Sequence, residues 1–281
     1  MQRFSGIIFF SLIVCCTMIA VTPAVSAATT EVHIVRYAAD NITVINETTV
    51  TYQWMEANLP VLGDGTTHYY HQGPVFVDDS DPAREEELRW NAGEDTNVQE
   101  KDMGAVKGTD LKDLCNLVGG MSPKDTVKIK ATDGFTKTFS YENVYTPPAR
   151  QGPMVITWHH DVEGYVPDYR TGMRLVFLAD NSSNLWKIHA FGNYDWHESA
   201  APEHWYYYRQ GDEKYPTTTG LSVQYISDIL IYSGSTTQGE PARTATTAAD
   251  AAPTKAGISP LTIVYSITAC CFLGYVLQKR S

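Results

Sequence analysis

His68 and His71 are the first two residues whose types and spacing could support chemistry. They stand three residues apart in the stretch Gly65 to Phe76, which reads GTTHYYHQGPVF. On a helix both imidazoles would share one face and could bind Zn²⁺. The neighbouring glycines and Gly73-Pro74 favour a loop or a strand, where residues three apart point to opposite faces. We therefore assign no metal ligands here and expect a segment packed by its own tyrosines.

Two later segments carry further histidines and carboxylates. The residues concerned are His159, His160 and Asp161 in the first segment and Asp195, His197, Glu198 and His204 in the second. If the two segments met in space, they could hold a metal or an acid–base pair. Polar residues at strand ends would explain the same pattern, so the sequence leaves both interpretations open.

A group of three aspartates is the next candidate. Asp78, Asp79 and Asp81 supply hard oxygen ligands of the kind that Ca²⁺ prefers. They lack the spacing of an EF-hand loop and its central glycine. A solvated acidic loop is the favoured interpretation.

An aromatic segment follows near the end of the folded region. It contains Trp186, Trp196, Trp205 and the run Tyr206 to Tyr208. Exposed rings could stack on sugars or on a partner protein, whereas buried rings would belong to the core. The sequence favours the core but does not exclude a binding surface.

The elements that must position these residues are mainly strands. Strands are predicted around 31–37 and 41–54, with a short helix before Pro60, because apolar and β-branched residues alternate with polar ones. A hairpin is predicted over 126–144, with Asp133-Gly134 as its two-residue turn. The charged stretch 77–106 has little periodicity and predicts a long surface loop with one short helix.

One amphipathic helix interrupts the strands. It begins near Thr109 as N-cap, and Gly119-Gly120 ends it. Its apolar face consists of Leu111, Leu114, Leu117 and Val118. With no alternation of strand and helix and no internal repeat, the expected class is α+β, as a single β-rich domain.

The two ends of the chain predict a protein held at the cell surface. Residues 1–27 have the layout of a secretory signal peptide, and 28–233 form the ectodomain. A Thr/Ala/Pro-rich stalk at 234–257 leads to an uncharged segment at 258–277, long enough to span a bilayer. The basic tail at 278–281 is expected in the cytoplasm. Alternatively, the apolar segment is a sorting signal that is exchanged for a lipid.

Composition agrees with an extracellular domain. The chain has 21 basic and 32 acidic residues, which argues against nucleic acid or an anionic lipid surface as partner. The sequons at Asn41, Asn46 and Asn181 predict N-glycosylation. Cys115 is the only cysteine between residues 28 and 233, so no disulfide forms within the ectodomain, and a buried structural thiol is expected.

Two motifs resemble the molybdopterin-binding domain of the sulfite-oxidase family. The matching positions are Gly108, Leu111 and Leu114 on the predicted helix, Asp133, Gly134 and Phe135 in the hairpin, and Gly172, Arg174, Leu175 and Val176 in a later strand. The resemblance spans about Val106 to Ala179, and the whole ectodomain is similar to archaeal surface proteins that carry this domain. It implies the molybdopterin-binding fold.

The resemblance also implies where a cofactor would sit. By position, Tyr70, His71 and Arg174 would line a molybdopterin site. The family's molybdenum-ligand cysteine has no counterpart between Thr66 and Val106, and His or Tyr is no equivalent of a thiolate. We therefore expect no cofactor and no catalysis, but binding or structural work at the envelope, with an envelope protein or a glycan as partner. The alternatives are a molybdopterin-dependent oxidoreductase outside the cytoplasm and a glycan or cell-wall binding module.

Overall fold

The computed structural model describes residues 28–77, 79–90, 98–182 and 187–234. The described residues form a β-rich α+β fold with two large sheets, one small two-stranded sheet and short helices. The predicted class is therefore confirmed. The predicted signal peptide, nearly all of the stalk, the apolar C-terminal segment, Asp78 and Trp186 lie outside the described residues.

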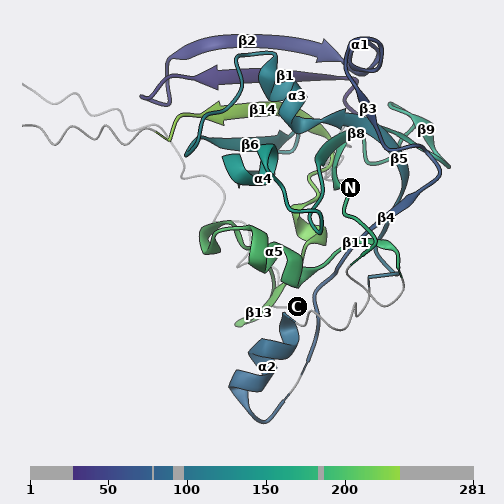
Figure 1. The fold of residues 1–281 in the computed structure, drawn as a ribbon, viewed down its shortest axis with the longest axis vertical. Coiled ribbons are helices and arrows are strands. Elements are labelled where there is room, and N and C mark those ends of the chain that lie inside the picture. Colours follow the sequence, from purple (N-terminus) through teal and green to yellow (C-terminus); the bar gives the residue numbers. More distant parts are fainter. Residues whose placement is uncertain (1–27, 78, 91–97, 183–186, 235–281) are drawn as a thin grey trace, which may run out of the picture. The chain divides into compact units, whose positions relative to one another are not determined.

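The first sheet brings the first and last described strands together. Its order is β2 (Val44–Thr51), β1 (Glu31–Tyr37), β14 (Ile226–Tyr232), β6 (Thr126–Ala131) and β7 (Thr136–Ser140). Strands β1 and β14 are parallel, and the other pairs are antiparallel. Figure 1 shows β2, β1, β14 and β6 side by side. The pairing of β1 with β14 closes the domain around the residues between them.

The second sheet carries His68, His71, His159, His160 and Arg174 among the polar candidates. Its path is β10 (Arg174–Phe177), β8 (Met154–His160), β5 (Asp102–Asp110), β4 (His68–His71) and β11 (His189–Phe191), with β3 (Val61–Leu62) beside β5 and β9 (Gly164–Tyr165) beside β8. Strands β4 and β11 are parallel, and the other neighbours are antiparallel.

The helices are short and cover the sheets and their ends. They are α1 (Tyr52–Asn58), α2 (Pro82–Arg89), α3 (Leu111–Asn116), α4 (Tyr141–Tyr145), α5 (Asn193–Ser199) and the 3₁₀ turns η1 (Pro202–His204) and η2 (Thr219–Leu221). The hairpin β12 (Tyr207–Gln210) and β13 (Glu213–Pro216) forms the small sheet. Among the described residues, no helix has both the length and the apolar character needed to cross a membrane.

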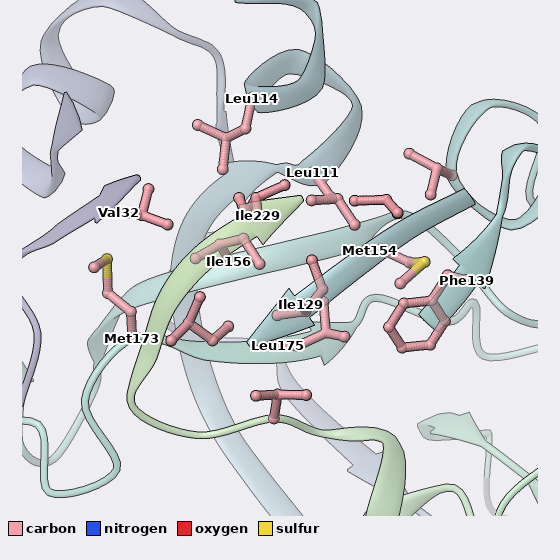
Figure 2. Packing of buried hydrophobic residues seen from close by; sticks show 14 of the residues in the cluster. Val32, Leu111, Leu114, Ile129, Phe139, Met154, Ile156, Met173, Leu175 and Ile229 are labelled. Atoms are coloured by element: carbon pink, nitrogen blue, oxygen red, sulfur yellow. The ribbon is translucent and has the colours of Figure 1, made fainter. Parts of the chain in front are cut away.

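The core consists of side chains from both large sheets and from α3. Figure 2 shows Val32, Ile129 and Ile229 of the first sheet packed with Ile156 and Leu175 of the second. The α3 residues Leu111 and Leu114 join the same cluster and are fully buried. Burial of each such side chain contributes about 1.5–3 kcal/mol. The packing between the two sheets and α3 is therefore the main source of stability.

The predicted helix and hairpin are present, with shifted bounds. Helix α3 ends at Asn116, before Gly119-Gly120, and residues 141–144 of the predicted hairpin belong to α4. The hairpin turns around Asp133-Gly134, and Gly134 has a φ of 89° that suits glycine. The loop has three residues, 132–134, in place of the predicted two, because the Ala131 N–H bonds to the Phe135 carbonyl.

The helix begins one residue later than expected, because Asp110 rather than Thr109 is the N-cap and accepts the Lys112 N–H. Thr109 still belongs to β5 and is fully buried.

The predicted stretch 77–106 contains the expected short helix, but it is wrong as a loop at its C-terminal end. Residues Pro82–Arg89 form α2, capped by Asp81, and Asp102 begins the central strand β5. Gly104 in β5 has no room for a side chain, since a Cβ there would lie 2.1 Å from His160 Nε2. Glycine and charge lower the strand propensity of this segment, and pairing with β4 and β8 overrides that local preference.

Close backbone packing around Gly152 gives a stability prediction. A Cβ at Gly152 would lie 1.9 Å from the Leu178 carbonyl oxygen, whereas one at Gly134 would meet nothing within 4 Å. Both glycines have positive φ, so both substitutions share the backbone strain. We expect Gly152→Ala to lower the free energy of unfolding by about 2 kcal/mol more than Gly134→Ala. Urea denaturation of the two variants tests this, and equal losses would contradict the packing.

Candidate functional site

His71 is a fully buried, neutral side chain. It lies on β4, and its Nε2 accepts the backbone N–H of Phe177 at 3.2 Å. The rings of Phe177 and Phe191 pack edge-on against it, with centroids 5.5 and 5.7 Å away. Burial, followed by the charge of Arg174, lowers the pKa of His71 to about 3. The imidazole therefore acts as a hydrogen-bond acceptor in the interior at neutral pH.

Arg174 lies in the same region, and Tyr70 does not. The Arg174 Nε donates to Ser222 Oγ at 2.6 Å, and its charge acts on His71. Tyr70 is half-buried, with its ring 6.4 Å from that of His68 near the surface. The structure thus groups two of the three residues that the resemblance assigned to a cofactor.

The residues around His71 do not fit the molybdenum centre that the resemblance implies. Such a centre needs an accessible cysteine thiolate as ligand. Cys115, the only cysteine among the described residues, is fully buried in α3 within the hydrophobic core. Burial raises the pKa of its thiol far above the usual range, so it stays protonated.

His68 belongs to a separate surface cluster. Its Nδ1 lies 2.7 Å from Asp102 Oδ2, and its Nε2 lies 3.7 Å from Asp161 Oδ2. The other oxygen of Asp161 lies 3.2 Å from His160 Nδ1. The two histidines of His-x-x-His therefore face different surroundings, as expected for a strand. In the part of the chain that the structure describes, no three His, Cys, Asp or Glu side chains form a metal-ligand group.

The residues of the second polar segment stabilise the start of helix α5 and pack around it. Asp195 accepts the Gly192 N–H at 2.8 Å and pairs with Arg150. His197 stacks on Trp205 with ring centroids 4.3 Å apart. These contacts differ from those of His160 and Asp161, so the structure does not bring the two polar segments together.

The remaining polar candidates also have structural partners. Glu198 pairs with His197, and the carbonyl of His204 accepts the indole N–H of Trp196 at 3.1 Å. His159 is partly buried beside Tyr165, and burial lowers its pKa. In the acidic stretch, Asp79 pairs with Arg84, while Asp81 caps α2 through the Ala83 N–H.

The aromatic segment divides between core and surface. Trp196 is buried in the core, and Trp205 packs against it. Tyr208 is 45% exposed and meets Phe76 edge-on with centroids 6.0 Å apart. Tyr206 is partly buried and lines a pocket.

This pocket has a volume of about 260 Å³ and is built from three distant parts of the chain. The β6–β7 turn contributes Phe135, which is 40% exposed, together with Asp133. The segment before β12 contributes Tyr206, and the segment 219–225 contributes Ser222 and its neighbours. Aromatic faces beside a few polar groups are typical of small-molecule sites. We call this the Tyr206 pocket.

Gly220 allows the Tyr206 ring to take its place. A Cβ at Gly220 would lie 1.8 Å from Tyr206 Cε1, so the ring packs directly on the glycine backbone. The adjoining residue Thr218 is fixed by a buried network. Its hydroxyl accepts the Gln72 N–H at 2.8 Å and donates to the Phe191 carbonyl at 2.7 Å. The wall of the pocket is therefore tied to β4 and β11.

A lysine lies against two of the rings that line the Tyr206 pocket. The ammonium of Lys137 on β7 is 3.3 Å from the Tyr206 ring centroid and 4.7 Å from that of Phe135. Burial lowers the pKa of Lys137 to about 8. At neutral pH most molecules still carry this charge, held by two ring faces.

Sequence analysis identified only parts of this pocket. It singled out Asp133 and Phe135 as a turn motif and Tyr206 as part of an aromatic run. Lys137 and the segment 219–225 carry no local signal, because their role depends on strand pairing and on the fold of η2. The aromatic run beside a hairpin motif was the only available indication. A scan against models of protein families found no match, and a search of curated proteins found none either.

The neutral state of His71 predicts how stability depends on pH. Below pH 6.5 the unfolded chain takes up a proton at this residue, whereas the folded chain does not until about pH 3. As the pH falls through this window, the free energy of unfolding should therefore decrease by about 1.4 kcal/mol per pH unit because of His71 alone. His71→Gln keeps an acceptor but cannot titrate, so its stability should fall less steeply. Urea denaturation between pH 7 and pH 4 measures the two slopes.

The matched control is His68→Gln, at a partly exposed position of the same strand. It should retain the steep dependence on pH. Equal slopes in the wild type and His71→Gln would contradict a buried, neutral His71.

Proposed function

We propose that the protein is a cell-surface binding protein, held outside the membrane by its C-terminal segment. The domain that resembles the molybdopterin-binding fold binds a ligand or partner of the envelope and performs no redox reaction. Support for the location comes from the sequence of both chain ends and from the stalk. The three sequon asparagines, Asn41, Asn46 and Asn181, are exposed, as attachment of glycans requires.

One observation carries the proposal of a non-catalytic domain. The only cysteine available to the domain, Cys115, is closed within the hydrophobic core as a protonated thiol. His71 is fully buried, with the rings of Phe177 and Phe191 packed edge-on against it. A solvent-facing pocket, the Tyr206 pocket, lies elsewhere and supports a binding function.

The alternative function is a molybdopterin-dependent oxidoreductase with an unusual ligand set. The motifs around Gly108, Asp133 and Arg174 support it. To separate the two, we would purify the full-length protein in detergent from its native source, or from a host that makes the cofactor. We expect neither molybdenum nor pterin fluorescence above the background of a mock purification. One molybdenum and one pterin per chain would overturn the proposal.

Membrane anchoring gives a separate prediction. A chain that stops after residue 257 should leave the membrane fraction, because it lacks the uncharged segment 258–277. Cell fractionation and immunoblotting measure this. Deleting 238–257 instead removes a similar length of stalk and should leave the protein with the membrane. Retention of the shortened chain in the membrane fraction would contradict anchoring by this segment.

A further inference from the structure

The Tyr206 pocket has positive charge around it that the protein itself does not neutralise. The Lys137 ammonium lies over the rings of Tyr206 and Phe135, which line the pocket, and Arg174 donates to Ser222, which also lines it. Among the described residues, no carboxylate forms an ion pair with either cation. Desolvation lowers the pKa of both groups, which means that the surroundings compensate their charge poorly.

The charge balance of the pocket differs from that of the whole chain. The protein has a net charge of −11, and many of its other cations pair with carboxylates, as Lys130 does with Asp228 at 3.3 Å. At the pocket, Asp133 is the single carboxylate among the lining residues, and it already accepts the Phe135 N–H at 2.8 Å. A ligand that brings a negative charge would therefore stabilise the bound state.

The uncharged part of the lining indicates what else the ligand contains. Phe135 and Tyr225 present ring surfaces, while Thr219 and Gln224 present a hydroxyl and an amide group. The Ser222 hydroxyl already bonds to Arg174 and to the Leu175 carbonyl. An apolar face beside several hydrogen-bonding groups matches a sugar ring, which has C–H faces and a rim of hydroxyls. The small volume suits one sugar unit of a longer chain.

We infer that the Tyr206 pocket binds a carboxylate-bearing sugar unit, such as a uronic acid, of a surface glycan. This inference rests on the proposed binding function and names its ligand class. The ring of the sugar packs on Phe135, its hydroxyls bond to Thr219 and Gln224, and its carboxylate lies toward Lys137. Gly220 makes the site possible, because it leaves room for the Tyr206 ring in the wall of the pocket.

The test compares sugars that differ only in the carboxylate. Ligand-observed NMR titrations would use full-length protein in detergent with methyl glucuronide and methyl galacturonide, each against its neutral methyl glycoside. We expect at least one uronide to bind about tenfold more tightly than its neutral counterpart. Acetate at the same concentration should not displace it. No binding of either uronide, equal binding of the neutral sugar, or displacement by acetate would overturn the inference.

Variants locate the site. Lys137→Met should remove the preference for the uronide, and Phe135→Ala should weaken binding of both sugars while leaving the fold intact, since Phe135 is half-exposed. The matched control is Lys128→Met, because Lys128 also lies over a tyrosine ring, that of Tyr232 at 5.0 Å, but outside the pocket. It should bind like the wild type, and urea denaturation would verify that all three variants are folded.

The outcomes separate the two proposals. Uronide binding that is unchanged in Lys137→Met and Phe135→Ala would overturn the assignment to this pocket and leave a binding protein. Stoichiometric molybdenum and pterin, with no sugar binding, would overturn the binding function as well. The inference would be supported if Lys137→Met lost the preference for the uronide while Lys128→Met kept it.

Discussion

The buried hydrogen bonds of Thr218 are the constraint on which the candidate site depends. Its hydroxyl and backbone connect to Gln72 after β4, while its N–H also meets Asn193 Oδ1 at 3.0 Å at the start of α5. Asn193 in turn donates to the Pro216 carbonyl at 3.0 Å. Buried polar groups are costly unless they are satisfied, so this network specifies one arrangement of the segment that enters η2. That arrangement places Gly220 and the Tyr206 pocket.

The same network separates an interior region from a solvent-facing one. On the interior side, His71 is held by Phe177 and packed by aromatic rings, which keeps it neutral. On the outer side, Tyr206 and Phe135 leave a hollow beside Lys137. The domain therefore combines a closed interior, where the resemblance would place a cofactor, with an open pocket elsewhere. This contrast is the physical basis for proposing binding in place of redox chemistry.

Elements with strong local signals could be predicted from the sequence. The Asp133-Gly134 turn and the apolar face of α3 are present because turn chemistry and periodicity act over a few residues. Strand β5 was missed, because its glycines and charges oppose a strand and its stability comes from both neighbours. The Tyr206 pocket could be predicted only in fragments. Lys137 has no local feature that marks it, and its importance follows from a ring about 70 residues away.

The most direct test of this account is a crystal structure of the protein soaked with the methyl uronide. The account predicts a sugar ring over Phe135 with its carboxylate toward Lys137, and unchanged packing around His71. Electron density for a pterin or a heavy metal beside His71 and Arg174 would contradict it. Sugar density confined to another surface would contradict the assignment of the Tyr206 pocket.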